Sequence, residues 1–214
     1  MKIACISDLH RQHESVELPY ADILIIAGDY DILESYKESV IHAIAFRKWL
    51  LGIRDKYKHI IIIAGNHDFG LQDFPELSEF TFDGFTYLQD SGVTIDGINF
   101  WGSPTTPEFC GWAFMKDRGE PLRKHWEKIP DNTNVLITHG PPLGVRDMLT
   151  TEGRRCGDLQ LLERVKQLQE LKYNIFGHIH DGYGIEKIGK TTFINCSVLD
   201  EQYQLANEPI VFEY

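Results

Sequence analysis

The chain has 214 residues, 43% hydrophobic and 25% charged, a composition typical of one globular α/β domain with a substantial core. Its formal net charge is −11, from 21 Lys and Arg against 32 Asp and Glu. This excess of acid, without any Lys- or Arg-rich run, argues against a broad nucleic-acid-binding surface and a stable nucleic-acid partner. We expect a single domain over residues 1–214.

The cysteine spacing and the apolar runs bear on location. The four cysteines lie far apart in the sequence and include no C-x-x-C pair. The first residues do not resemble a signal peptide, and no apolar run reaches the roughly 18 residues that a membrane-spanning helix needs. We therefore expect a reduced, soluble, cytoplasmic protein without a membrane partner.

The first part of the chain has the pattern of a parallel sheet. Residues 2–6 and 22–27 are short apolar runs rich in β-branched side chains, which favours strands. The first run leads into Asp8 and His10, whose side chains project the same way because they are two residues apart. The second leads into Gly28 and Asp29. Two strands therefore end in carboxylates.

A helix is expected between residues 34 and 57, where Gly52 is the one Gly or Pro. Such a helix would return the chain to the next strand of a βαβ unit. One broad helical face holds Val40, Ile41, Ile44, Ala45 and Leu51. Phe46 and Trp49 lie off this stripe, so we expect them to pack against another element.

Residues 58–68 hold the most informative single stretch. Four consecutive Ile make a run too short for a buried helix, which indicates a strand covered on both faces. Gly65 lets the backbone turn, and Asn66, His67 and Asp68 follow at the carboxyl end of that strand, where open α/β sheets bind ligands. The tetrapeptide alone could also be a capped loop, so its meaning depends on whether other strands end similarly.

The middle of the chain is less regular. Residues 69–85 suggest a loop with a short helix, and residues 85–101 suggest antiparallel hairpins with turns at 90–92 and 96–97. Residues 103–121 combine Gly, Pro and aromatic side chains, and we expect them to shape a substrate cleft. Phe109 and Trp112 could stack on a base or pin their own loop, and these alternatives stay open.

Two strands in the second half end in histidines. Residues 134–138 lead into His139, and residues 173–176 lead into Gly177-His178-Ile179-His180. Helices are expected at 122–128 and 158–171, and short strands at 183–188, 191–195 and 210–212. Arg154 and Arg155 could bind a phosphate, although paired arginines before a helix are more often solvated.

Five strand ends thus supply seven oxygen and nitrogen donors: Asp8, His10, Asp29, Asn66, His139, His178 and His180. We expect these donors at the same edge of one sheet, a pattern that core packing would not generate. Imidazole, carboxylate and amide without thiolate suit Mn, Fe, Zn or Co. Seven ligands are too many for one open site and suit two divalent ions roughly 3.5–4 Å apart that share a carboxylate.

These motifs resemble a known family. Asp8-x-His10, Gly28-Asp29, residues 65–68, His139 and residues 177–180 are similar to the five blocks of the calcineurin-like metallophosphoesterases. Residues 101–104, 109–112, 138–144 and 177–184 are similar to the metallophosphoesterase-domain-containing subgroup, which is associated with class III cyclic-nucleotide phosphodiesterase activity. The resemblance implies an α/β fold, a four-layer α/β/β/α sandwich of two mixed β-sheets with the metals at one rim.

The resemblance also implies a role for each residue. Asp8, His10 and His180 would hold one ion, Asn66, His139 and His178 the other, and Asp29 would bridge them. His67 would donate a proton to the leaving oxygen or bind the phosphate, and Asp68 would orient the His67 ring. The substrate would contact Asn66, His67, His139, Gly140, Phe109 and Trp112.

The implied function is a metal-dependent phosphodiesterase that uses two divalent ions, with Mn expected. It would hydrolyse a small nucleotide phosphodiester, such as a 2′,3′- or 3′,5′-cyclic nucleotide, by attack of a metal-bridging hydroxide. A phosphomonoesterase is the nearest alternative. A nucleotide-monophosphate-binding module with low turnover is the alternative of a different class, and the presence of His178 argues against it.

Overall fold

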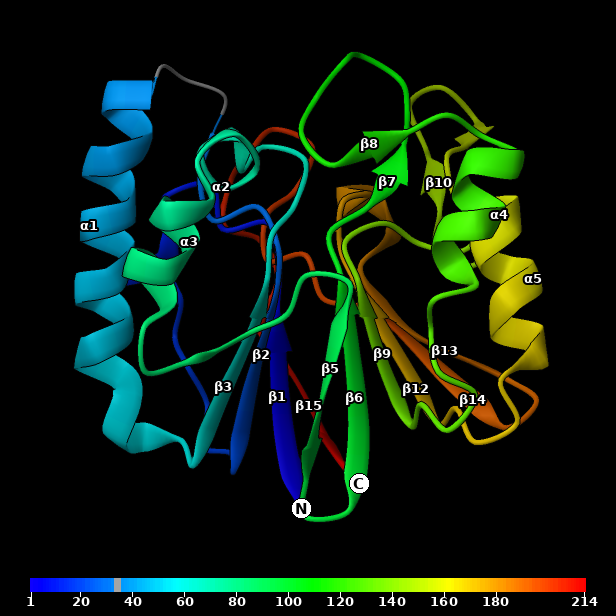
Figure 1. The fold of residues 1–214 in the computed structure, drawn as a ribbon, viewed down its shortest axis with the longest axis horizontal. Coiled ribbons are helices and arrows are strands. Elements are labelled where there is room, and N and C mark those ends of the chain that lie inside the picture. Colours follow the sequence, from blue (N-terminus) through cyan, green and yellow to red (C-terminus); the bar gives the residue numbers. More distant parts are fainter. Residues whose placement is uncertain (33–35) are drawn as a thin grey trace.

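The computed structural model describes residues 1–32 and 36–214. Two β-sheets lie face to face at the centre of the molecule, and helices cover their outer faces (Figure 1). This arrangement confirms the four-layer α/β/β/α sandwich with two mixed sheets. Within the described ranges, no helix is both long and apolar enough to cross a membrane.

The first sheet has the strand order β15-β1-β2-β3-β4. Its parallel strands are β1 (Lys2–Ile6), β2 (Ile23–Ala27), β3 (His59–Ile63) and β4 (Thr86–Tyr87), and β15 (Ile210–Glu213) runs antiparallel to β1. The side chains of β2 are all buried, and those of β1 and β3 are buried after the first residue. A strand covered on both faces needs such a continuous apolar run, which is why the sequence located these three correctly.

The second sheet has the order β13-β14-β12-β9-β6-β5. Its strands are β5 (Ser91–Ile95), β6 (Ile98–Ser103), β9 (Val135–Thr138), β12 (Tyr173–Phe176), β13 (Gly184–Ile188) and β14 (Thr191–Asn195). The four central strands are parallel, and the edge strands β5 and β13 are antiparallel to their neighbours. The turn at 96–97 joins β5 to β6 as predicted. The turn predicted at 90–92 is wrong, because Ser91 and Gly92 already pair within β5.

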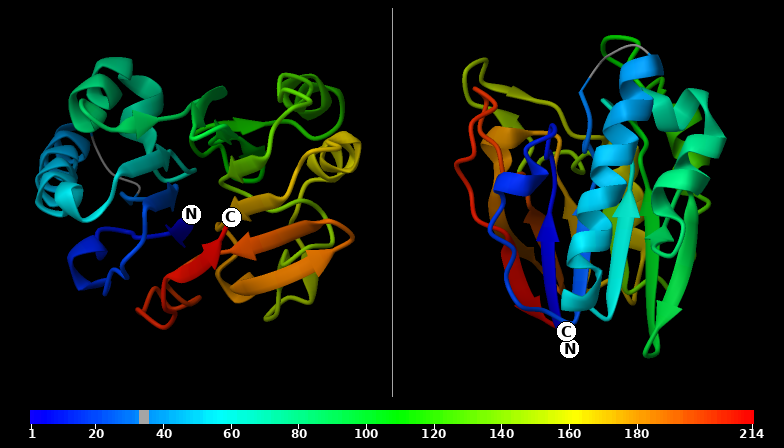
Figure 2. Two further views of the ribbon diagram at one scale, coloured as in Figure 1. Left: turned by 90° about the horizontal axis from the view of Figure 1, so that it is seen from below. Right: turned by 90° about the vertical axis from the view of Figure 1, so that its left-hand side faces the viewer.

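Helices cover the outer face of each sheet. On the first lie α1 (Tyr36–Ile53), α2 (Phe69–Asp73) and α3 (Pro75–Phe82), and on the second α4 (Glu120–Trp126) and α5 (Leu159–Gln167). Figure 2 shows α1 running along the strands of the first sheet. The start predicted for this helix, at residue 34, lies outside the described residues. Single turns of 3-10 helix occur at His13–Ser15, Arg54–Lys56 and His180–Gly182.

The helical stripe read from the sequence is not the face of α1 that packs on the sheet. Ile41, Ile44 and Leu51 are 53%, 52% and 47% exposed, whereas Phe46 is fully buried and stacks on Tyr30. Helix α1 has apolar residues on two sides, so periodicity alone could not select the buried one. The larger apolar area of an aromatic ring favours the face that carries Phe46.

The strand ends that carry the candidate donors meet at one rim, the upper one in Figure 1. They do not belong to one sheet as expected: β1, β2 and β3 are in the first sheet, and β9 and β12 are in the second. The two sheets join at this rim, where Ser7 after β1 pairs in parallel with Ser197 after β14. The second sheet therefore brings its histidines over the carboxylates of the first.

Two further short strand pairs lie beside the rim. Strand β7 (Thr106–Pro107) pairs with β8 (Met115–Lys116), and β10 (Met148–Leu149) pairs with β11 (Arg154–Arg155). Both pairs belong to segments between longer elements, and Figure 1 shows them above the second sheet. These two strand pairs lie where their side chains can form part of the wall of a site at the rim.

Candidate metal centre and substrate cavity

Unusual backbone conformations mark the strand ends at the rim. The φ angles of Asp8, His10, Asp29 and His178 are 57°, 38°, 55° and 66°. Residues other than Gly rarely adopt this left-handed region, although Asn, Asp and His do so more often than the rest, and such conformations gather at functional sites. These Asp and His residues therefore adopt the left-handed conformation more readily than most side chains would, and it places all four at one rim of the molecule.

One group of possible ligand atoms consists of Asp8, His10 and His180, which lie within 4.8 Å of one another. Nε2 of His180 is 3.5 Å from Oδ1 of Asp8. The backbone N–H of His178 donates to both oxygens of the buried Asp8 carboxylate, at 3.1 and 3.0 Å. This contact links the first and second sheets through residues 170 positions apart.

A second group surrounds Asp29. Nε2 of His139 is 3.2 Å from Oδ2 of Asp29 and 2.8 Å from Oδ1 of Asn66. On its other side, the same Asp29 oxygen is 3.8 Å from Nε2 of His10. The His178 ring lies beside that of His139, with their centroids 5.1 Å apart. Asp29 therefore lies between His10 and His139, the position that a shared ligand would occupy.

Three histidines are oriented in the same way. Nδ1 of His10, His139 and His180 lies 3.1, 2.9 and 2.8 Å from the backbone carbonyl oxygens of Asp31, Ala27 and Asp200. Since a carbonyl oxygen only accepts, each Nδ1 carries a proton and each Nε2 faces the carboxylates. Histidine ligands of metals are held by this kind of second hydrogen bond. Nε2 of His10 is buried and has no hydrogen-bond partner, so a cation would satisfy it.

The carboxylates and imidazoles perturb each other strongly. Burial acts to lower the pKa of His139, but the Asp29 charge outweighs it, and this pKa rises to about 9. Burial acts likewise on His180, where the interaction with Asp8 raises the pKa to about 9. The pKa of His178 falls to about 3 through burial and the nearby charge of His139. Protons on His139 and His180 thus stand in for the positive charge that divalent ions would bring.

His67 and Asp68 do not interact as the sequence suggested. Both oxygens of Asp68 accept backbone N–H groups, from Gly65 at 2.7 Å and from Asp29 and Asp31 at 3.0 Å each. Asp68 therefore fixes the loops that carry the ligands, and it does not orient the His67 ring. That ring packs against His10 and Trp112 at centroid distances of 4.7 and 4.4 Å, and its Nδ1 is buried without a partner.

Gly65 is required for space more than for its backbone freedom. A Cβ atom at this position would lie 2.6 Å from the backbone nitrogen of Asp29 and 2.7 Å from Cε1 of His139, and it would overlap Oδ1 of Asp29. The φ angle of Gly65 is not positive. The sequence located this glycine correctly, but its role is the close approach of β3 to the ligands.

A cavity of about 200 Å³ opens above the candidate ligands. His10, Asp29, Asn66, His67, His178 and His180 line it, together with Pro107, Phe109, Trp112 and Arg118 from the 103–121 segment. That segment does shape the cleft, as predicted. Phe109 contacts both Trp112 and His178, with centroid distances of 5.2 and 5.7 Å.

The cavity also differs from the prediction. Gly140 and the fully buried His139 do not line it, although both were expected to contact the substrate. Tyr203 was missed: its ring lies 4.8 Å from that of His10 and 5.4 Å from that of His180. Tyr203 lies in an irregular loop without a motif, so no sequence signal pointed to it.

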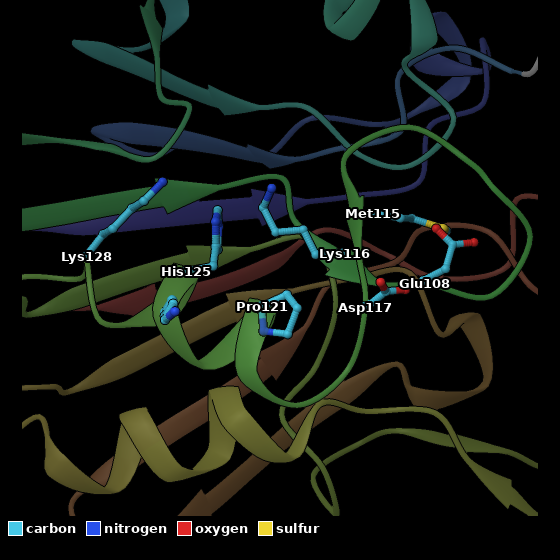
Figure 3. Close-up of a pocket in the computed structure, with 8 residues that line it drawn as sticks. Glu108, Met115, Lys116, Asp117, Pro121, His125 and Lys128 are labelled. Atoms are coloured by element: carbon cyan, nitrogen blue, oxygen red, sulfur yellow. The ribbon is translucent and has the colours of Figure 1, made fainter.

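A wider hollow, of about 550 Å³, lies between α4 and β8 (Figure 3). Its walls mix charges of both signs, Lys116, Lys124 and Lys128 beside Glu108 and Asp117. Two of these lysines already pair with carboxylates, Lys124 with Glu120 at 3.5 Å and Lys128 with Asp90 at 3.8 Å. None of the seven candidate ligands lines this hollow, so we place the site in the smaller cavity.

The sequence of this chain is similar to those of known proteins. The calcineurin-like phosphoesterase family matches residues 1–182. The chain is 37% identical to human metallophosphoesterase domain-containing protein 1 over 235 residues, covering 99% of this chain and 70% of that protein. It is 39% identical over 226 residues to a UPF0046 protein of Caenorhabditis elegans, covering 99% and 74%.

The fold agrees as well. The crystal structure of TT1561 of Thermus thermophilus superposes with a TM-score of 0.56 at 12% sequence identity, covering 91% of this chain and 88% of that one. At this identity the likeness concerns the fold alone. The resemblance read from the strand-end motifs is thus confirmed by the sequence relatives.

Proposed function

The chain belongs to the calcineurin-like phosphoesterase family and is therefore a metal-dependent phosphoester hydrolase. We propose that it is a dinuclear phosphodiesterase that acts on small nucleotide phosphodiesters. The observation that carries this proposal is the convergence of candidate ligands from both sheets at a small cavity walled by Phe109 and Trp112. The first candidate substrates are 2′,3′- and 3′,5′-cyclic nucleotides.

The donor set fits two divalent cations. Asp8, His10 and His180 would hold one and Asn66, His139 and His178 the other, with Asp29 shared, as its place between His10 and His139 supports. Bound there, the ions supply positive charge that activates water near neutral pH and offsets charge on the phosphate. Mn, Fe, Zn and Co all suit these ligands, and we propose Mn.

The side chains of this protein have separate tasks. His10, His139 and His180 keep their protons on Nδ1, toward the carbonyls, so that Nε2 is available to a cation. His67 lines the cavity without sharing its ring nitrogens with Asp68, and it is placed to give a proton to the leaving oxygen. Asn66 also lines the cavity, so its amide group would contact the phosphate as well as the metal.

The size of the cavity favours a compact substrate. A volume of about 200 Å³ lies below the roughly 300–1,000 Å³ of common ligand pockets, which suits one nucleotide better than a polymer. Phe109 and Trp112 provide aromatic faces for a base. The four unpaired cysteines support our further proposal of a reducing, cytoplasmic location.

The test is turnover by metal-stripped protein reloaded with Mn²⁺. Bis-p-nitrophenyl phosphate, p-nitrophenyl phosphate, 2′,3′-cyclic AMP and 3′,5′-cyclic AMP are compared, with Asp29→Asn as the blank. We expect the diester and one cyclic nucleotide to be hydrolysed faster than the monoester. Preference for the monoester would establish the phosphomonoesterase instead. Binding of AMP without turnover of any substrate would establish the binding module.

A further inference from the structure

Three guanidinium groups line the same cavity as the candidate metal ligands. Arg118 comes from the segment after β8, and Arg154 and Arg155 form β11 of the hairpin beside the rim. In a chain of net charge −11, such a gathering of arginines at one cavity is not expected from composition. It suggests that the cavity receives an anion at more than one place.

The three arginines are not equally available to a ligand. Nη1 and Nη2 of Arg118 donate to the backbone carbonyls of Gly157 and Cys156, at 2.9 and 3.0 Å. Arg118 thereby ties the hairpin to the neighbouring segment. Arg154 pairs with Glu152 at 2.9 Å, and both side chains are more than half exposed. Arg118 thus uses both of its terminal nitrogens within the protein. The exposed pair of Arg154 with Glu152 does not hold the Arg154 guanidinium in one orientation.

Arg155 is held differently. Its Nη1 donates to Oδ1 of Asp147 at 2.7 Å, while the side chain as a whole is 50% exposed. Asp147 is fully buried, and its other oxygen accepts the backbone N–H groups of Gly144 and Gly157, at 2.8 and 3.2 Å. Asp147 is therefore held in place by the backbone, and its Oδ1 orients one edge of the Arg155 guanidinium. Nε and Nη2 remain for a ligand in the cavity.

A guanidinium fixed in this way recognises phosphate. Its planar fork matches two oxygens of one phosphate, and a preorganised fork loses little entropy on binding. The scissile phosphate is already accounted for by the proposed metal ligands, which lie on other segments of the cavity wall. A second phosphate is the group that would complement Arg155.

We propose that the substrate carries a second phosphate, remote from the scissile phosphoester, and that Arg155 binds it. The proposal rests on the proposed function, because the metal-ligand side of the cavity must take the first phosphate. The substrate class narrows accordingly, from nucleotide phosphodiesters in general to nucleotides with a further phosphomonoester. Arg154 adds positive charge at the same place, and Arg118 positions the hairpin.

Calorimetric binding of two probes tests the proposal. The Mn²⁺-loaded protein is titrated with AMP and with adenosine 3′,5′-bisphosphate, which differ by one phosphate. A charge-assisted hydrogen bond contributes enough for us to expect the bisphosphate to bind about tenfold more tightly or better. In Arg155→Gln this ratio of dissociation constants should fall to about one. Arg155→Lys, which keeps charge but not the fork, should retain only part of it.

The matched control is Arg123→Gln on α4. Arg123 is half-exposed, pairs with Glu120 and Glu127, and does not line the cavity, so this change removes the same charge elsewhere. Arg123→Gln should therefore show the same ratio of dissociation constants for the two probes as the wild type. The proposal is overturned if the wild type binds both probes equally, or if Arg155→Gln leaves the ratio unchanged. Turnover of bis-p-nitrophenyl phosphate by the wild type separately reports whether the proposed function stands.

Discussion

His67 is the residue whose role most needs to be separated from that of its neighbours. Its ring lies in the cavity beside His10 and Trp112, and a group of possible ligand atoms includes His67 with His10 and Asp29. Two roles are therefore compatible with its place, proton donor and third ligand. They differ in what happens to bound metal when the ring is removed.

We expect His67→Ala to keep its metal and to lose activity selectively. A proton donor matters most for a poor leaving group, so hydrolysis of an alkyl phosphodiester should slow by about 10²–10⁴. Nitrophenolate leaves without help, so bis-p-nitrophenyl phosphate should slow much less. Metal content by mass spectrometry and the two rates check this. Loss of metal, or an equal slowing of both substrates, would show that His67 is not the acid.

His13, outside the site, makes a prediction about stability. The side chain is buried between Phe46 and Trp49, with centroid distances of 5.2 Å to each, and burial lowers its pKa although Glu14 opposes this. Near pH 6.5, His13 is therefore more protonated in the unfolded chain than in the folded protein. Its contribution to the free energy of unfolding is present above that pH and falls as the pH drops through it.

Urea denaturation of the wild type and His13→Leu at a series of pH values measures this contribution. Between about pH 7.5 and 5.5 the wild type should lose more stability than the variant, because leucine cannot titrate. The difference between the two proteins cancels the other titrating groups. Parallel curves for the two proteins would rule out a buried neutral His13.

At the scale of elements, replacing either of two glycines by alanine should have opposite effects. Gly52 lies in α1, and a Cβ atom there would meet nothing within 4 Å. Gly52→Ala should stabilise the protein by about 0.5–1 kcal/mol, since alanine favours the helix. Gly65→Ala should instead disturb Asp29 and His139 and weaken metal binding. Denaturation midpoints and metal titrations compare the pair. A destabilised Gly52→Ala would mean that this face of α1 is covered.

The elements also show where sequence reasoning succeeds. Strand β1 lies at residues 2–6, as predicted, because the residues after Lys2 form the apolar run that a strand buried on both faces requires. Strand β12 also lies where it was predicted, at residues 173–176, although it includes the buried polar Asn174. The buried face of α1 was not recoverable, because two of its faces are apolar and only the packing of Phe46 distinguishes them. Helices α2 and α3 lie where only a loop with a short helix was expected.

The site likewise contains residues that the sequence could identify and residues that it could not. The candidate ligands could be listed from the sequence because each follows a recognisable strand, and the contacts of Asp8, Asp29 and His139 bring them together. Tyr203 and Arg118 could not be found, since each reaches the cavity from an irregular segment whose path depends on the folded core. The role of Asp68 was missed because its partners are backbone groups, which leave no trace in side-chain patterns.

At the scale of the whole molecule, the site joins two sheets that the sequence could not tell apart. The carboxylates of Asp8 and Asp29 follow the first sheet, and His139 and His178 follow the second. Periodicity reports which strands are buried but not which sheet each joins. Divalent ions bound by ligands from both sheets should therefore stabilise the packing of one sheet against the other.

Metal removal should lower the stability of the whole protein. Ligands that bind only the folded state stabilise it by mass action, by about 2.7 kcal/mol when their concentration is a hundred times the dissociation constant. We expect chelation to lower the melting temperature of the wild type and to leave that of Asp29→Asn almost unchanged. Equal melting temperatures with and without metal in the wild type would contradict a site shared by both sheets.

The most direct test of the central claim is a titration of metal-free protein with Mn²⁺, with hydrolysis of bis-p-nitrophenyl phosphate followed at each ratio of metal to protein. The dinuclear phosphodiesterase predicts that two ions bind per chain and that hydrolysis reaches its maximum only when the second has bound. Saturation of hydrolysis at one ion per chain, or no hydrolysis of the diester at any ratio, would contradict it.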